Sequence, residues 1–193
     1  MTFRPELILA FRIVVRVLTE LAVPYALIGG AARNLWGTPR STTDLDFEVL
    51  VEAPMLDRLT QVLAQRGLPV YRRHQSSDSG DSLPDLVVVR FGGEAGVRVD
   101  LLLSKTPFQQ QAVRRAVQVP FQDETCRAIT MEDLVVYKLI ADRPRDRLDV
   151  LDVLGARLRS GGTVDWVHIE HWAAEWGVTD ALNRARAQLD DAS

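Results

Sequence analysis

The sequence contains little cysteine, histidine and lysine, and each shortage excludes a kind of site. Its 193 residues include one cysteine, three histidines and two lysines, Lys105 and Lys138. A single cysteine, Cys126, excludes an internal disulfide and a cysteine-based zinc cluster. The formal net charge of −3 gives no overall basic field of the kind that marks nucleic-acid-binding proteins.

Long hydrophobic runs are also missing, and we expect no secretory leader. The most apolar stretch, residues 7–23, is interrupted by Arg12, Arg16 and Glu20. Their four-residue spacing places these side chains on one helical face, which predicts an amphipathic helix packed on a core. We therefore expect a cytoplasmic protein that has no membrane partner.

The sequence does contain the alternation of a mixed α/β protein, followed by a purely helical pattern. We expect an α+β fold with a boundary at residue 130: a small mixed sheet flanked by helices in residues 1–130, and a C-terminal helical region, residues 131–193, packed on it. The expected strands are 25–28, 41–51, 69–73, 85–91, 96–103, 117–121 and 127–129, and residues 75–83 read as a loop. The expected helices are 5–21, 31–36, 54–66, 107–116, 131–141, 144–158, 164–176 and 179–189.

The segment from residue 25 to residue 48 holds the most informative chemistry. A short apolar run ends in Gly29 and Gly30, and a helix-forming segment follows. Because glycine has no Cβ, such a strand-to-helix turn lets backbone N–H groups approach an anion closely. The pattern predicts a phosphate-binding turn.

Two carboxylates follow about a dozen residues later. In an extended chain Asp44 and Asp46 point the same way, while Leu45 and Phe47 point into the core. Neighbouring carboxylates repel each other and raise each other's pKa, and a hard divalent cation such as Mg²⁺ removes that repulsion. A phosphate turn beside a metal-binding pair indicates chemistry on a nucleoside triphosphate.

Asp100 is a single carboxylate in a strand otherwise made of valine and leucine. A buried carboxylate needs a partner. If its strand lies beside strand 41–51, Asp100 completes a three-carboxylate site for two metal ions roughly 3.5–4 Å apart. The alternative is a solvated residue at the sheet edge.

Lys138 falls in a helical stripe with Met131, Leu134 and Ala141 that otherwise faces a core. Such a lysine either extends to the surface or meets an anion. On the next helix Arg145, Asp149 and Asp152 share one face, with the leucines mainly on the other. That polar face is either solvated, with an Arg145–Asp149 ion pair, or lies near Lys138.

Three residues around the carboxylate pair have two interpretations each. Thr42 shares the predicted strand face of the aspartates, where phosphorylation would add close to two negative charges and block nucleotide binding; alternatively it is a strand-forming threonine. Arg33 and Arg40 either reach phosphates from the glycine-containing segment or are surface arginines.

The ordered motifs resemble a known superfamily. The glycine pair, RSTTDLDF and the later VDLL resemble the DNA polymerase β-like nucleotidyltransferase superfamily. EDLVVYKLIADRPRDRLDVLDV is similar to the K-x-x-A and R-x-D-x-x-D pattern of the abortive-infection AbiEii toxin family. The related MenT-type toxins act as tRNA nucleotidyltransferases. The resemblance covers roughly residues 23 to 155.

The resemblance implies a role for each motif. Gly29 and Gly30 would hold the β- and γ-phosphates, with Ala31 standing where many members of the superfamily carry serine. The remaining implied roles are metal binding by Asp44, Asp46 and Asp100, acceptance of the attacking hydroxyl's proton by Asp100, nucleotide binding by Arg40 and Thr42, neutralisation of phosphate charge by Lys138, and orientation of Lys138 by Asp149.

The implied activity is a metal-dependent transfer of NMP from an NTP to an acceptor hydroxyl, with release of pyrophosphate and two Mg²⁺ ions, or Mn²⁺, as cofactors. The resemblance points to a tRNA 3′ end as acceptor and to the toxin of a toxin–antitoxin or phage-defence system, with a cognate antitoxin as partner. The alternatives are a small-molecule acceptor, as in aminoglycoside or lincosamide nucleotidyltransferases, a protein hydroxyl, or a catalytically weak relative that serves as a regulatory binding partner.

Overall fold

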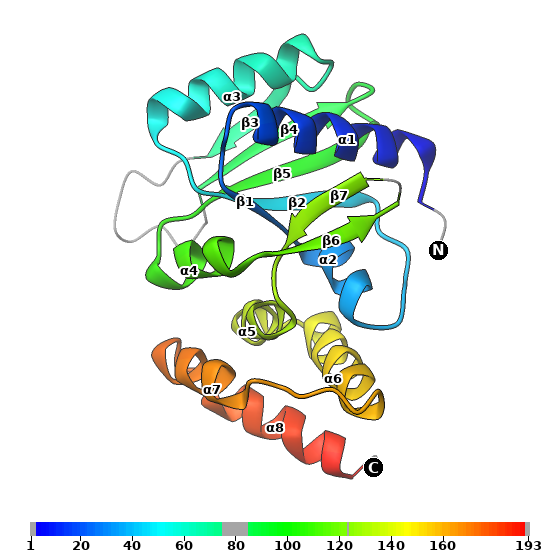
Figure 1. Ribbon diagram of the computed structural model, residues 1–193, viewed down its shortest axis with the longest axis vertical. Coiled ribbons are helices and arrows are strands. Elements are labelled where there is room, and N and C mark those ends of the chain that lie inside the picture. The colour runs from blue at the N-terminus through cyan, green and yellow to red at the C-terminus, as the bar shows by residue number, and fades with distance from the viewer. Residues whose placement is uncertain (1–2, 75–84, 123, 192–193) are drawn as a thin grey trace. The chain divides into compact units, whose positions relative to one another are not determined.

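The computed structural model describes residues 3–74, 85–122 and 124–191 (Figure 1). The chain divides into two compact units. The first, Met1–Ala31 with Ser41–Ile129, is called the α/β unit below; the second, Ala32–Arg40 with Thr130–Ser193, is called the helical unit. The predicted loop 75–83 lies outside the described residues.

The α/β unit is built on a seven-stranded mixed sheet with the strand order β3-β4-β5-β2-β1-β7-β6. Its strands are β1 (Tyr25–Ile28), β2 (Asp44–Val49), β3 (Val70–His74), β4 (Leu86–Phe91), β5 (Val97–Leu103), β6 (Val117–Phe121) and β7 (Glu124–Ala128). Its helices are α1 (Pro5–Glu20), α3 (Ala53–Gln65) and α4 (Pro107–Arg115), and α2 (Gly29–Trp36) starts in this unit. The predicted α+β class is confirmed.

The alternation of residues along β2 separates a packed face of the sheet from a polar one. Leu45 and Phe47 are fully buried, and the Phe47 ring lies 6.2 Å from the ring of Phe11 on α1. Helix α1 therefore covers the face that carries Leu45 and Phe47, as Figure 1 shows. Because side chains alternate along a strand, Asp44 and Asp46 lie on the opposite face.

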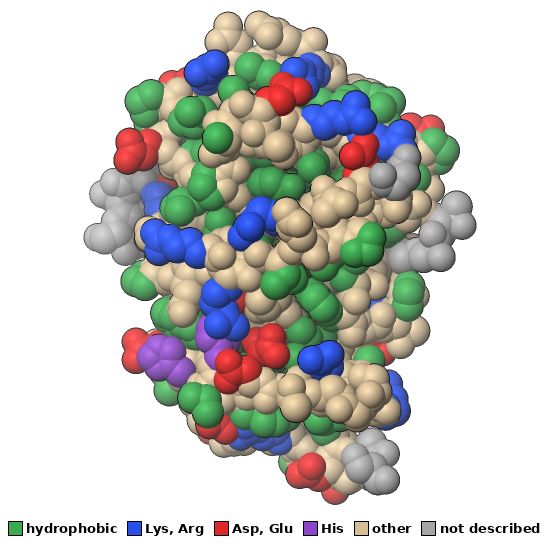
Figure 2. Space-filling model, viewed as in Figure 1, with side chains coloured by type: hydrophobic (Ala, Val, Ile, Leu, Met, Phe, Trp, Pro, Cys, Tyr) green, Lys and Arg blue, Asp and Glu red, His purple; other side chains and the backbone are tan. Residues whose placement is uncertain are grey.

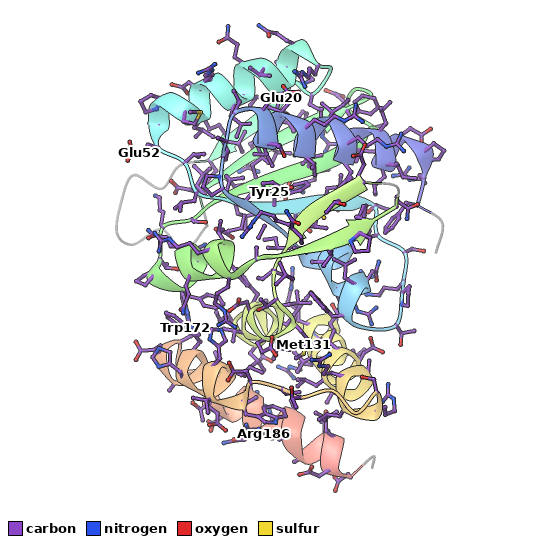
Figure 3. The ribbon with its side chains drawn as sticks, in the orientation of Figure 1. Glu20, Tyr25, Glu52, Met131, Trp172 and Arg186 are labelled. Atoms are coloured by element: carbon purple, nitrogen blue, oxygen red, sulfur yellow. The ribbon has the colours of Figure 1, made fainter. Side chains whose placement is uncertain are left out.

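The helical unit contains α5 (Met131–Ala141), α6 (Pro144–Arg159), α7 (Trp166–Glu175) and α8 (Thr179–Asp190). Thr130 caps α5, because its hydroxyl accepts a hydrogen bond from the Asp133 backbone N–H at 3.2 Å. Arg186 of α8, labelled in Figure 3, joins α8 to α7: it lies 4.3 Å from the Trp166 ring centre and 2.5 Å from Glu170.

Three differences from the sequence expectations concern the elements themselves. Strand β2 starts at Asp44, so Thr42 precedes the strand. Residues 32–40 group with the helical unit. On α6, Leu148 and Leu158 are 67% and 44% exposed, so the expected leucine face is only partly buried. Within the described ranges no helix is long and apolar enough to cross a membrane.

Candidate active site

The pairing of β2 with β5 brings the three predicted carboxylates together. The two strands are parallel, with Asp46 opposite Asp100 and Asp44 opposite Arg98. Directly opposed residues share a face of the sheet, so Asp100 lies on the same face as the pair from β2. The sequence condition, that the Asp100 strand neighbours strand 41–51, is met.

The charges of the two neighbouring carboxylates oppose the ionisation of Asp46. Burial, followed by the negative charges of Asp100 and Asp44, raises the pKa of Asp46 to about 6. A hydrogen bond from the backbone N–H of Gly30 and the charge of Arg98 act in the opposite direction without cancelling the rise. A cation bound beside Asp46 would lower the free energy of ionising it.

The glycine pair lies against this cluster. Gly29 has φ +65°, and a Cβ at this position would overlap the carboxylate of Asp46. A Cβ on Gly30 would lie 2.9 Å from the Thr42 hydroxyl oxygen. Gly29 therefore requires glycine, and a side chain at Gly30 would crowd the Thr42 hydroxyl, so the turn lies close to β2 and the segment before it.

Thr42 lies just before β2, and its hydroxyl donates to the backbone oxygen of Asp44 at 3.2 Å. The expectation that Thr42 shares a strand face with the aspartates is wrong, because the strand starts two residues later. The residue is nevertheless beside Gly30 and Asp44 through these two contacts.

Arg98 is a site residue that sequence reasoning missed. Its Nε and Nη2 donate to the two oxygens of Asp100, each at 2.7 Å. The hydrogen bond from Arg98 to Asp100 raises the pKa of Arg98, and the charges of Asp44 and Asp46 contribute. The available signal was its position two residues before Asp100 in a strand, which places both side chains on one face.

The donor chemistry of this cluster fits a divalent cation, although Arg98 is bonded to one of the three carboxylates. Carboxylate oxygens are the ligands that Mg²⁺ and Mn²⁺ prefer. In the described part of the chain, however, no group of three or more His, Cys, Asp or Glu side chains is arranged to hold a metal ion. Both oxygens of Asp100 are bonded to Arg98. By their chemistry Asp44 and Asp46 could hold an ion, and Asp100 could join them more readily after Arg98 releases it.

Lys138, in the helical unit, meets carboxylates of the protein. Its ammonium group lies 2.6 Å from Asp146 and 2.9 Å from Asp149, and the residue is only 8% exposed. The alternative in which Lys138 extends to the surface is wrong. Burial acts to raise the pKa of Asp146, but hydrogen bonds from Arg143 and Lys138 outweigh it and lower that pKa.

Asp149 is shared by three cations. Besides Lys138, it pairs with Arg40 at 2.8 Å and with Arg33 at 3.1 Å. Burial acts to raise its pKa, but the hydrogen bonds from Arg40 and Lys138 outweigh burial and lower it. The solvated-face interpretation of this part of α6 is wrong, because Asp149 is 2% exposed.

Asp152 of α6 bonds both to Arg33 of α2 and to Thr38, which follows α2. Arg33 is 5% exposed and donates to Asp152 at 2.6 Å, so it is not a surface arginine. Asp152 also accepts from the backbone N–H and the hydroxyl of Thr38, both at 2.7 Å. A Cβ on Gly37 would overlap the Asp152 carboxylate.

Asp146 is a second residue that sequence reasoning missed. It precedes Asp149 by three residues, which places the two side chains on the same face of α6. That spacing was the available signal. Asp146 is 1% exposed and accepts a hydrogen bond from Arg143 at 2.5 Å, in addition to the one from Lys138.

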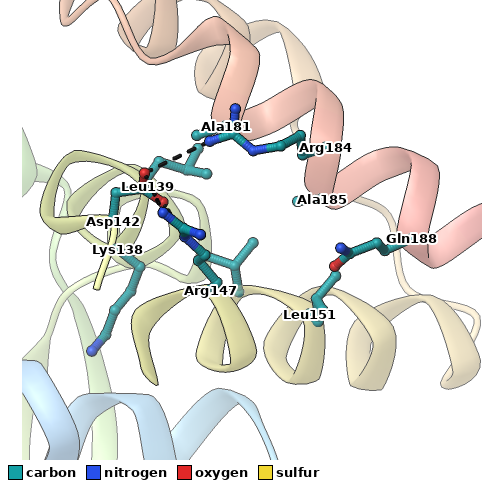
Figure 4. Close-up of a pocket in the computed structure, with 10 residues that line it drawn as sticks. Lys138, Leu139, Asp142, Arg147, Leu151, Ala181, Arg184, Ala185 and Gln188 are labelled. Atoms are coloured by element: carbon teal, nitrogen blue, oxygen red, sulfur yellow. Dashed lines mark hydrogen bonds and ion pairs between the residues drawn. The ribbon is translucent and has the colours of Figure 1, made fainter. Parts of the chain in front are cut away.

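A separate cavity of about 90 Å³ lies among α5, α6 and α8 (Figure 4). Its apolar lining includes Leu139, Val150 and Ala181. At its edge Arg147 lies 2.7 Å and Arg184 3.6 Å from Asp142. The cavity therefore has apolar lining residues together with charged ones that pair with each other.

No family model matches the sequence, and no curated protein matches it. Solved structures are similar to it. The antibiotic-resistance factor ANT(2″)-Ia has a TM-score of 0.57 and 13% identity, over 94% of this chain and 97% of that one. The lincomycin-bound lincosamide antibiotic adenylyltransferase LnuA has a TM-score of 0.53 and 16% identity, over 80% and 98%. An antigenic nucleotidyltransferase-like protein from Paracoccidioides brasiliensis has a TM-score of 0.50 and 17% identity, over 91% and 92%. At these identities the likeness shows the fold, which is the nucleotidyltransferase fold.

Proposed function

We propose that this protein is a metal-dependent nucleotidyltransferase, which transfers NMP from an NTP to an acceptor hydroxyl and releases pyrophosphate. The observation that carries the proposal is the gathering of Asp44, Asp46 and Asp100 on one face of two paired strands, beside a turn that requires glycine at Gly29. The nucleotidyltransferase fold supports it.

The residues of the α/β unit divide the work of the reaction. Asp44 and Asp46 would hold a divalent cation, Mg²⁺ or Mn²⁺, which would neutralise triphosphate charge and make the attacking hydroxyl more acidic. Asp46 must lose its proton first, and with its pKa at about 6 it is mostly ionised at neutral pH. We assign phosphate binding to the turn at Gly29 and Gly30 on the basis of the resemblance of its motif; its backbone approaches Asp46 and Thr42 closely. Asp100, once released by Arg98, accepts the proton of the attacking hydroxyl.

In the helical unit we assign Lys138 to neutralisation of phosphate charge, on the basis of the resemblance of its motif. Asp149 orients the ammonium group, since it lies 2.9 Å away, and Arg40 is oriented by the same carboxylate. The lowered pKa of Asp149 supports this role, because it favours the charged carboxylate that pairs with these cations.

The acceptor that we propose is a tRNA 3′ end, in a toxin that a cognate antitoxin controls. The support is the K-x-x-A and R-x-D-x-x-D pattern of residues 138–152. A small-molecule hydroxyl is the second candidate. It is favoured by the likeness to ANT(2″)-Ia over nearly the whole of both chains. On the face in Figure 2, the Lys and Arg side chains of the described residues are interspersed with Asp and Glu, so an RNA would meet mixed charge there.

The test supplies both kinds of acceptor to the same protein. Purified protein is incubated with Mg²⁺ or Mn²⁺ and each of the four α-³²P-labelled NTPs, with total tRNA in one series and a panel of aminoglycosides and lincosamides in the other. The double variant Asp44→Asn/Asp46→Asn is the inactive control, and Asp57→Asn, an exposed aspartate on α3, is the matched active control.

Label on tRNA that depends on the β2 carboxylates supports the RNA acceptor. Label on an antibiotic supports the second candidate and moves the protein out of the toxin class. If folded protein labels neither acceptor and releases no pyrophosphate with a cell extract, the transferase proposal fails and the binding-partner alternative replaces it.

A further inference from the structure

The guanidinium of Arg98 is hydrogen-bonded to Asp100, the third carboxylate of the candidate metal site. Two parallel hydrogen bonds of 2.7 Å join it to both oxygens of Asp100. Arg98 lies opposite Asp44 across the paired strands, and its positive charge also interacts with Asp46. One protein cation therefore stands among three carboxylates, where a divalent ion is expected.

We propose that Arg98 is a built-in counter-ion that competes with the metal ion for Asp100. The inference rests on the proposed function, because it concerns the regulation of the same site. With Arg98 on Asp100, each oxygen of that carboxylate already accepts one charge-assisted hydrogen bond, so Asp100 is a weaker ligand for a cation than a free carboxylate. Occupancy of the site is therefore set by a competition between two positive charges.

The geometry makes this exchange feasible without rebuilding the sheet. A planar guanidinium fork matches a carboxylate in two-point contact, and such pairs are among the stronger hydrogen bonds in proteins. The Arg98 side chain is nonetheless 43% exposed, while that of Asp100 is 13% exposed. The guanidinium can therefore move into water while Asp100 and its strand stay in place. A cation arriving at Asp44 and Asp46 would repel the guanidinium and favour its departure.

The exchange has a consequence for how the protein loads its substrates. A metal ion alone must displace Arg98 without compensation. A metal ion that arrives with a triphosphate brings an anion to which the displaced guanidinium can pair. The wild-type protein should therefore bind a free metal ion weakly and the metal–nucleotide complex more strongly.

The test is direct metal binding, with no turnover involved. Mn²⁺ is titrated into full-length protein without nucleotide, and free Mn²⁺ is followed by electron paramagnetic resonance. Arg98→Met removes the charge and keeps the length of the side chain, so we expect Mn²⁺ to bind about three- to tenfold more tightly, as suits loss of a partly exposed charge-assisted pair. Arg98→Lys keeps the charge without the two-point contact and should give an intermediate affinity.

The matched control is Arg90→Met. Arg90 is the register partner of Arg98 on the neighbouring strand β4. Its guanidinium lies over the Tyr71 ring, 4.5 Å from the ring centre, instead of on Asp100. The control removes the same charge from the same region, and we expect its Mn²⁺ affinity to stay within about twofold of the wild type.

The outcomes separate this inference from the proposed function. If folded Arg98→Met or, should that variant not fold, Arg98→Gln binds Mn²⁺ no more tightly than wild type, the competition does not exist. An equal gain in Mn²⁺ affinity in Arg90→Met would show that loss of any nearby positive charge has this effect, and it would also overturn the proposed competition. In either case wild-type release of pyrophosphate from NTP still upholds the transferase. Absence of both Mn²⁺ binding and pyrophosphate release in all variants overturns the two proposals together.

Discussion

Asp46 and Asp100 lie opposite each other on the parallel strands β2 and β5. Burial, and after it the charge of Asp100, raises the pKa of Asp46 to about 6. The pair therefore stores electrostatic repulsion in the folded protein, and this has a measurable effect on stability. Sites that bind charged ligands commonly carry such a cost.

Asp46→Asn should stabilise the metal-free protein increasingly as the pH rises above about 4, with the full gain above about 6. The folded-state pKa is raised, so ionisation favours the unfolded chain, and stability falls as pH rises from about 4 towards about 6. The amide cannot ionise and avoids this loss. We expect a gain of about 1–3 kcal/mol near pH 8 and little gain near pH 4. Urea unfolding at both pH values, in a chelator, measures it; equal gains at both would contradict the electrostatic cause.

Gly29→Ala should destabilise the protein by about 2–4 kcal/mol, because the residue has φ +65° and its Cβ would overlap the Asp46 carboxylate. Gly93→Ala separates the two causes. Gly93 has a similar φ of +82°, and among the described residues no atom beyond its chain neighbours lies within 4 Å of the place that its Cβ would take, so it carries only the backbone cost of about 1–2 kcal/mol. Thermal unfolding of the two variants gives the difference, and equal losses would show that crowding by Asp46 is not significant.

Asp149→Asn should be among the most destabilising single changes in the helical unit. The substitution leaves Lys138, Arg33 and Arg40 without the carboxylate they share, and removal of one member of a buried charge cluster typically costs about 3–5 kcal/mol. Asp142→Asn breaks an exposed pair with Arg147 and should leave the unfolding midpoint unchanged. Guanidinium unfolding compares them, and similar midpoints for both variants would mean that the cluster around Asp149 is not stabilising.

Thr42→Glu should give a folded protein that has lost nucleotide-dependent activity. The hydroxyl lies beside Gly30 and bonds to Asp44, so a carboxylate there adds negative charge next to the phosphate turn and the aspartates. We expect a loss of at least about tenfold in pyrophosphate release. Thr43→Glu adds the same charge one residue away on an exposed side chain and is the control. Normal activity in Thr42→Glu, or equal loss in both, would remove Thr42 from the site.

The fold was largely predictable because its signals are local. Alternation of Asp44, Leu45, Asp46 and Phe47 predicted a strand with one buried face, and both apolar residues are fully buried. The pairing of β2 with β5 joins segments far apart in the sequence, so it was not predictable from local patterns. From the sequence, a three-carboxylate site was expected only on the condition that the strand of Asp100 lies beside β2. The register supplied that information.

The partners of Arg33 were not predicted, because they lie far from it in the sequence. Arg33 pairs with Asp149 and Asp152, more than a hundred positions away, and nothing in a short helix signals such partners. Arg98 was overlooked for a different reason. A charged residue in a half-exposed strand is usually solvated, and only the position of Asp100 on the same face indicated a pair.

The inclusion of residues 32–40 in the helical unit bears on how this protein can be cut or recombined. Asp149 and Asp152 of α6 have their cations, Arg33 and Arg40, in that early segment. A fragment that starts at residue 130 would carry the two acids without these partners and should be insoluble or unfolded. In evolution, an exchange of the C-terminal helices alone would meet the same obstacle. The early segment and the late helices must therefore be inherited together, although about ninety residues of the other unit separate them.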